Sequence, residues 1–247
     1  MSHTMAVTLE ATGVQYRSSS DEAAFFEWLD HIAAVQSYDG GYGNTEVIVI
    51  NPDAIDEQTL QEFVALYRRY HVDPAELQVF KEGKLGQWFA APERFWHKEV
   101  FNGPLMTPDD DQISVGNNQP ESTEYIWSIE PSVGAHTGTW QTEAKPTELA
   151  KPVILQASDI VYYSPLDERA FFEWLDKSPI VDSYEARQRA LKISVNVDID
   201  EKWDLAEFPA LYDRYNIDMR QLRALNAGPF ASWFSSVERW WYAAVFG

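Results

Sequence analysis

The sequence contains no cysteine and few basic residues. Its 247 residues include 39 Asp and Glu but only 19 Lys and Arg, which gives a formal net charge of −20. Without cysteine there is no disulfide scaffold, thiolate metal site or cysteine nucleophile. The shortage of Lys and Arg argues against binding to phosphate backbones, because that binding depends on cationic side chains displacing counterions. We therefore expect no direct nucleic-acid binding.

Long apolar runs are also missing. No stretch reaches the roughly 18 apolar residues that a membrane-spanning helix needs. The first residues lack the basic and apolar regions of a signal peptide. These absences predict a soluble cytoplasmic protein without a membrane partner. Whole-chain disorder is excluded by 10 Trp, 12 Tyr and 13 Phe, since acidic disordered chains are poor in aromatics.

An internal repeat is the strongest signal in the sequence. The segment DEAAFFEWLD at 21–30 recurs as DERAFFEWLD at 167–176, with nine of ten positions identical. Further matches continue to the end of the chain at offsets of 144 to 146 residues. We therefore predict a tandem duplication. The first module covers 1–103, an acidic connector covers 104–150, and the second module covers 151–247.

Each module follows the same order of predicted elements. Alternation near residue 10 predicts a strand, and the repeated segment predicts a helix. A second strand is expected at 45–50, followed by a helix with an apolar stripe. A short helix and an aromatic helix at 84–101 close the unit, and Pro92 should bend the latter. The prediction is a β-α-β-α-α-α unit in an α+β (mixed α/β) protein.

The βαβ start of each module implies two parallel strands with a right-handed crossover. Because two strands make a marginal sheet, we expect the connector to supply more. The two copies are expected to pack about a pseudo-two-fold axis.

Several shared polar residues have the spacing of helix caps. Ser18 and Ser164 are predicted N-caps, each with an Asp three residues later, Asp21 and Asp167. This is the spacing of a capping box with Asp in place of Glu. Further predicted caps start the second helix of each module: Asp56 and Asp200.

No histidine is shared by the two modules. The repeat aligns its histidines with other residues: His31 with Lys177, His71 with Asn216, and His97 with Tyr242. A Ser–His–Asp triad or a His-based zinc site in both modules is therefore unsupported. We expect no catalytic residue, metal or cofactor, although an asymmetric site in one module stays open.

A Glu–Arg dipeptide recurs in the aromatic segment. Glu93 leans toward the apolar face of its predicted helix, where a carboxylate must be paired or change its pKa. Arg69 is the shared cation best placed to meet it. The prediction is a pair of structural ion pairs, Glu93–Arg69 and Glu238–Arg214. A glutamate general acid is the alternative.

The connector is the most acidic part of the chain. Residues 101–150 hold 8 acidic residues and 1 basic residue, and their tryptophans follow no helical pattern. An acidic surface with exposed aromatics is typical of a protein that binds a basic partner, although acidity for solubility is the simpler explanation. The candidate partner-binding residues are Asp109, Asp110, Asp111, Glu121, Glu124, Trp127 and Trp140.

Three functions follow from these observations. The leading hypothesis is a non-catalytic acidic protein that binds a basic protein, an immunity or inhibitor protein being the concrete version. The second is a hydrolase or a carbohydrate- or ligand-binding protein that uses carboxylates and Trp between the two modules. The third is a structural or regulatory subunit.

Overall fold

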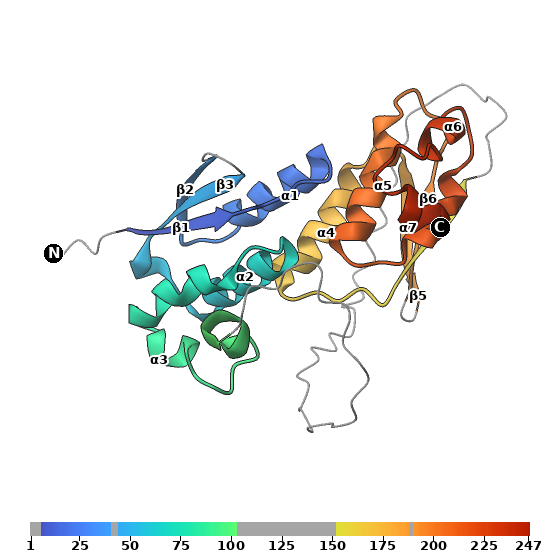
Figure 1. The fold of residues 1–247 in the computed structure, drawn as a ribbon. Helices are drawn as coiled ribbons and strands as arrows, with labels where there is room; N and C mark the ends of the chain where they lie inside the picture. Colours follow the sequence, from blue (N-terminus) through green and yellow to red (C-terminus); the bar gives the residue numbers. More distant parts are fainter. Residues whose placement is uncertain (1–5, 41–43, 103–151, 188–189) are drawn as a thin grey trace. The chain divides into compact units, whose positions relative to one another are not determined.

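We describe a computed structural model of the chain, restricted to residues 6–40, 44–102, 152–187 and 190–247. The protein is a mixture of helices and two small antiparallel sheets, as the α+β assignment predicts (Figure 1). Both halves belong to one compact unit. The predicted connector lies outside the described residues, and so do the strands expected from it.

The first sheet has three strands in the order β1-β3-β2. They are β1 (Val7–Thr12), β2 (Val35–Gly40) and β3 (Thr45–Ile50). The central strand β3 pairs antiparallel with both neighbours. Alternate residues of β3 are buried, as the apolar alternation of its sequence requires.

The prediction that the first strand and the strand at 45–50 run parallel was wrong, because β3 is antiparallel to β1. The strand β2 was missed because its sequence, VQSYDG, is polar and partly exposed along its length. The helix after β1 leads to β2, and the chain then reverses into β3. Because β3 is antiparallel to both neighbours, β1 and β2 run parallel but are separated by β3.

The second sheet has the same topology. Its strands β4 (Val153–Ser158), β5 (Val181–Arg187) and β6 (Ala190–Val195) lie in the order β4-β6-β5 and are all antiparallel to their neighbours. Even the break in register falls at matching places, Val35/Ser37 and Val181/Ser183.

The helices α1 (Ser19–Asp30) and α4 (Pro165–Lys177) begin as predicted. The hydroxyl of Ser18 accepts a hydrogen bond from the backbone N–H of Asp21, and Ser164 caps α4 in the same way. The Asp carboxylates then accept the N–H of the residue before the cap. These contacts confirm the predicted capping spacing.

The second helices are α2 (Glu57–Arg69) and α5 (Trp203–Arg214). Asp56 caps α2, as predicted. The prediction for Asp200 was wrong, because α5 begins three residues later and Lys202 at its N-cap makes no side-chain cap bond.

The aromatic helix predicted at the end of each module is broken in two. The first half has α3 (Gly86–Phe89) and a π-helical turn at Lys98–Asn102, and the second has α6 (Ala231–Phe234) and α7 (Tyr242–Phe246). Short 3-10 segments precede them at Pro74–Glu82 and Met219–Leu225. After the break, the indole N–H of Trp96 donates to the carbonyl oxygen of Phe89, the last residue of α3, at 2.9 Å. The indole N–H of Trp241 donates in the same way to Phe234 at the end of α6, at 3.0 Å.

Two apolar cores form, one around each sheet. Tryptophans shared by the halves lie in them, with Trp28 and Trp96 buried in one and Trp174 and Trp241 in the other. The helices α1 and α4 contact each other, so that Ala24 of α1 joins the second core. Ala170 of α4 likewise joins the first core.

Candidate functional site

Two buried ion pairs join the halves. Arg69 at the end of α2 binds Asp167 of α4 through Nε and Nη2, at 2.8 and 2.5 Å. Arg214 at the end of α5 binds Asp21 of α1 in the same two-pronged geometry, at 2.8 and 2.6 Å. Both aspartates are 0% exposed. We call these contacts the crossed clamps, because each half gives the acid to one clamp and the base to the other.

The arginines of the clamps have almost no free donor left. Besides its aspartate, Arg69 donates to the carbonyl oxygens of Val161 and Arg214, so four of its five N–H groups are bonded. Arg214 makes the equivalent bonds to Gln15 and Arg69. Burial opposes the charge of Arg69, but the hydrogen bonds and charge of Asp167 outweigh it and raise the pKa of the guanidinium.

Tyrosines complete the clamps. The guanidinium of Arg69 lies 4.2 Å from the ring centre of Tyr215, and that of Arg214 lies 4.2 Å from the ring centre of Tyr70. The hydroxyl of Tyr215 donates to the backbone carbonyl of Asp167, and the hydroxyl of Tyr70 donates to that of Asp21. Groups that are so fully bonded hold structure together and have no capacity left for a substrate.

The predicted partner of each buried arginine was wrong. Arg69 and Arg214 are buried cations as expected, but they bind Asp167 and Asp21. Glu93 and Glu238 are exposed instead. The reason is the broken aromatic helix, because residues 90–96 form turns and Glu93 no longer lies on an apolar helix face.

A buried glutamate in the first half also makes a hydrogen bond to the second half. Glu62 of α2 is buried and accepts hydrogen bonds from the indole N–H of Trp28 and from the hydroxyl of Ser164. Burial raises the pKa of Glu62, while these bonds lower it in part. In the other half, Glu207 accepts from Ser18 at 2.6 Å and is only half-buried.

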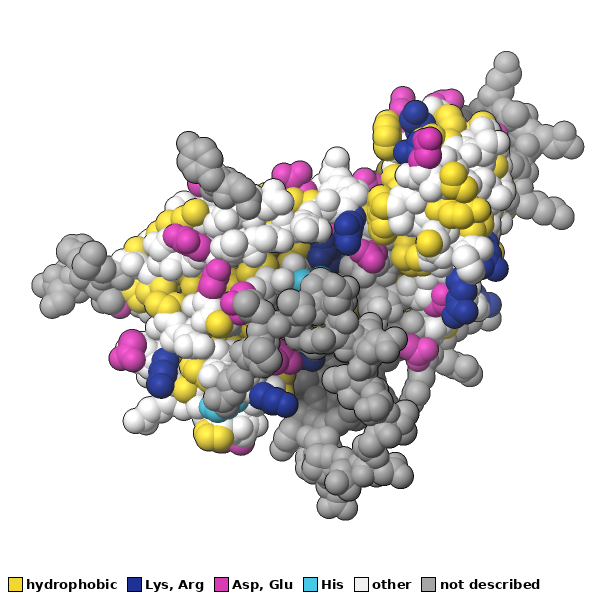
Figure 2. Space-filling model, viewed as in Figure 1, with side chains coloured by type: hydrophobic (Ala, Val, Ile, Leu, Met, Phe, Trp, Pro, Cys, Tyr) yellow, Lys and Arg dark blue, Asp and Glu magenta, His cyan; other side chains and the backbone are white. Residues whose placement is uncertain are grey.

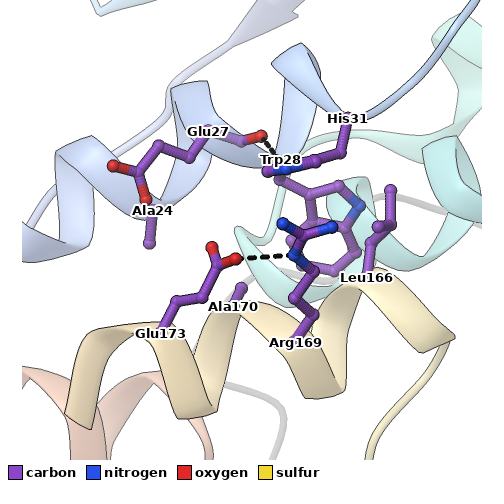
Figure 3. Close-up of a pocket in the computed structure, with 8 residues that line it drawn as sticks. All are labelled: Ala24, Glu27, Trp28, His31, Leu166, Arg169, Ala170 and Glu173. Atoms are coloured by element: carbon purple, nitrogen blue, oxygen red, sulfur yellow. Dashed lines mark hydrogen bonds and ion pairs between the residues drawn. The ribbon is translucent and has the colours of Figure 1, made fainter. Parts of the chain in front are cut away.

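Between α1 and α4 the packing leaves a void of only about 10 Å³, lined by the residues in Figure 3. The void has room for about one water molecule and none for a substrate. The side chains of Arg169 and Glu173 pair beside it, and Lys177 binds Glu27 between the two helices. The helix contact between the halves is therefore closed.

A wider cleft opens where the start of α1 meets the second half. Its volume is about 440 Å³. We call it the junction cleft. Its walls include Arg17, Ser18, Trp203, Glu207, Glu238, Arg239 and Trp240.

The junction cleft presents aromatic surface to solvent. Trp203 is 58% exposed and Trp240 is 44% exposed. Arg17 lies 5.2 Å from the ring centre of Trp240 and pairs with Asp213 at 3.0 Å. On the wall, Nε of Arg239 is buried without a hydrogen-bond acceptor among the described residues. Indoles, a donor without an acceptor and two carboxylates suit noncovalent binding of a polar ligand.

Sequence reasoning missed the junction cleft because it searched for residues shared by both modules. The cleft is asymmetric: Trp240 aligns with Phe95, and Arg17 aligns with Tyr163. A search for differences between the modules would have found both positions. The partner-binding residues predicted in the connector, from Asp109 to Trp140, lie outside the described residues.

Neither the surface of the described residues nor similarity to known proteins identifies a function. On the face shown in Figure 2, acidic side chains are scattered, with Lys and Arg among them. Within the described ranges, no group of three His, Cys, Asp or Glu could hold a metal ion, and no helix is long and apolar enough to cross a membrane. The chain matches no model of a protein family, no curated protein and no solved structure.

Proposed function

We propose that this is a non-catalytic cytoplasmic protein that binds a basic protein partner through the junction cleft. The observation that carries the proposal is the pair of exposed indoles, Trp203 and Trp240, on the walls of a cleft of about 440 Å³. Tryptophan and arginine are the residues most enriched among those that dominate binding energy at protein interfaces. Val237, three residues before Trp240, is a further exposed apolar side chain, at 74%.

The charge of the chain supports a basic partner. A net charge of −20 attracts basic proteins over long range and speeds their association at low salt. The carboxylates of Glu207 and Glu238 in the cleft are suited to receive basic side chains once the partner has docked. An immunity or inhibitor protein that neutralises a basic toxin or nuclease is the concrete version of this function.

The crossed clamps favour binding over catalysis. The buried acids Asp21 and Asp167 are each held by an arginine. A general acid or base must reach the proton that it transfers, and these carboxylates are fully enclosed. They hold the halves together and so support the cleft walls.

We further propose that the two halves descend from a tandem duplication and are related by a pseudo-two-fold axis. The matching strand order, the matching register breaks and the reciprocal clamps support this origin. Duplication followed by divergence accounts for a cleft with tryptophan at 240 and phenylalanine at 95.

A second candidate function is binding of a small polar ligand such as a carbohydrate. The observation that favours it is the presence of two indoles and two glutamates, Glu207 and Glu238, around one cleft. Indole faces stack on sugar rings, while carboxylates accept hydrogen bonds from the sugar hydroxyl groups. A glycan array that shows binding lost in Trp203→Ala would favour this function.

The leading proposal is tested by affinity capture with matched variants. The full chain is immobilised and exposed to native lysate at low salt, beside Trp203→Ala/Trp240→Ala and Phe95→Ala. Phe95 is an exposed aromatic at the position that aligns with Trp240, so it controls for nonspecific stickiness. We expect a basic protein that is retained by wild type and Phe95→Ala, lost by the double variant, and released as salt rises. Equal capture by all three, or capture independent of salt, would contradict the proposal.

A further inference from the structure

Glu46 stands in an unusual place for a carboxylate. It lies on β3, directly across from Ala11 of β1 and Gly40 of β2. Its side chain is on the same face of the sheet as buried Ile48, and it is only 8% exposed. An ionised carboxylate on the core face of a sheet needs a cation or a full set of hydrogen bonds.

Among the described residues, the carboxylate of Glu46 has neither. Oε1 accepts one hydrogen bond, from the hydroxyl of Tyr16 at 3.2 Å. Oε2 is buried without a hydrogen bond to any described residue. The charges that act on Glu46 are the negative charges of Glu22 and Asp39. Burial and these two acids raise the pKa of Glu46, and the Tyr16 bond lowers it in part.

The second half shows that the fold does not need this glutamate. Leu191 occupies the same register position on β6, opposite Ala157 and Ala186, and it is buried. The first half therefore carries a carboxylate with an unpaired buried oxygen where the second half carries an ordinary core residue. A residue that weakens the fold without serving the packing points to a ligand.

We propose that the carboxylate of Glu46 is a binding site for the lysine ammonium group of a partner protein. The unpaired Oε2 accepts one of the three ammonium N–H groups, and Glu22 and Asp39 draw the cation in. Gly40 has no side chain beside Oε2: a Cβ there would lie 3.7 Å from it. The ammonium group of lysine is a compact point charge that a single carboxylate oxygen can receive.

A metal ion is a poorer occupant. Among residues 6–40, 44–102, 152–187 and 190–247, no three His, Cys, Asp or Glu converge closely enough to hold one. A lysine ammonium needs fewer oxygen ligands than a divalent metal ion, because it has one charge and only three N–H donors. The identity of the donor as a partner rests on the proposed function; the site itself does not.

The test uses N-acetyl-lysine N′-methylamide, a neutral-ended model of a lysine side chain, with the full ¹⁵N-labelled chain. Amide shifts are followed in wild type, Glu46→Leu and Glu46→Gln. The Nε-acetylated compound has nearly the same shape without the charge. The amides of Leu191 and Ala186 in the second half serve as an internal control.

We expect saturable shifts at Gly40 and Glu46 with a dissociation constant on the order of millimolar, as so small a ligand allows. Affinity should fall at least about tenfold for the acetylated compound and for both variants, because a charge-assisted hydrogen bond is lost. Non-saturating shifts, equal shifts at Leu191, or unchanged binding by Glu46→Leu would overturn the proposal. The probe needs no partner protein, so a failure of Glu46 as a binding site and a failure of the proposed function are seen in separate experiments.

Discussion

The carbonyl oxygen of Arg214 accepts a hydrogen bond from Nη1 of Arg69, and the carbonyl of Arg69 accepts one from Nη1 of Arg214, at 3.1 and 3.2 Å. Both arginines are the last residues of their helices, α2 and α5. Carbonyl groups there have no partner within the helix. Each guanidinium therefore satisfies the open end of the helix that carries the other, which joins the crossed clamps into one network.

The first prediction concerns this network. Arg69→Leu should lower the free energy of unfolding by about 3–5 kcal/mol, because Asp167 would stay buried without its cation. Adding Asp167→Asn should recover part of the loss, since the amide oxygen can still accept from the N–H of Tyr163. Urea denaturation followed by tryptophan fluorescence measures both.

Arg169→Ala is the matched control for that experiment. Its exposed pair with Glu173 lies within one helix turn. Such a pair contributes about 0.3–0.5 kcal/mol. If Arg69→Leu were no worse than Arg169→Ala, the buried clamp would contribute no more than a surface pair.

The second prediction is that Glu46→Leu stabilises the protein by about 1 kcal/mol or more at pH 7, because it removes a buried oxygen without a partner. The raised pKa means that the folded state holds the Glu46 proton to a higher pH than the unfolded state does. The destabilisation by Glu46 therefore grows as pH rises through the folded-state pKa. The advantage of leucine should shrink as pH falls toward the unfolded value for glutamate.

Glu62→Leu should lower the free energy of unfolding at pH 7, whereas Glu46→Leu should raise it, although both glutamates are buried. Its carboxylate accepts from Trp28, Ser164 and the N–H of Leu166, so substitution leaves these donors unpaired. We expect a loss of about 1–3 kcal/mol. Denaturant titrations of both variants at several pH values check the pair of signs. If both substitutions changed the free energy of unfolding in the same direction, hydrogen bonding would not be what distinguishes these buried acids.

The third prediction compares two tryptophans of the repeated segment. Trp28 donates its indole N–H to Glu62 at 3.1 Å, whereas the buried N–H of Trp174 has no hydrogen-bond partner among the described residues. Trp28→Phe should therefore lower the free energy of unfolding by about 1–2 kcal/mol more than Trp174→Phe does, because only the former breaks a hydrogen bond to a buried carboxylate. Chemical denaturation of both variants measures the difference, and equal losses would contradict this explanation.

Much of the local structure was predictable because its causes are local. The caps Ser18 and Ser164, the helix α2 and the strand β3 each follow from a few adjacent residues. The strand β2 was not predictable in this way. Its polar sequence becomes a strand only because β3 offers it an edge.

The partner of Arg69 was hidden for a different reason. Asp167 is 98 residues away in sequence, and it first serves as the third residue of a capping box. Helix capping was enough to explain Asp167, so nothing in the sequence pointed to its second role as the partner of a buried arginine. The candidate sites were hidden because Glu46 and Trp240 differ between the halves, whereas the sequence pattern drew attention to the residues that the halves share.

The crossed clamps have a consequence for the independence of the halves. The first half alone would leave Asp21 without Arg214 and Arg69 without Asp167, so it would lack the ion pairs that hold it in place. It does carry one acid and one base of the right geometry, however. Two identical copies of it hold every group needed to close both clamps between them. Under the duplication proposed above, the ancestral single-module chain is expected to form a homodimer, and gene fusion would make that association permanent.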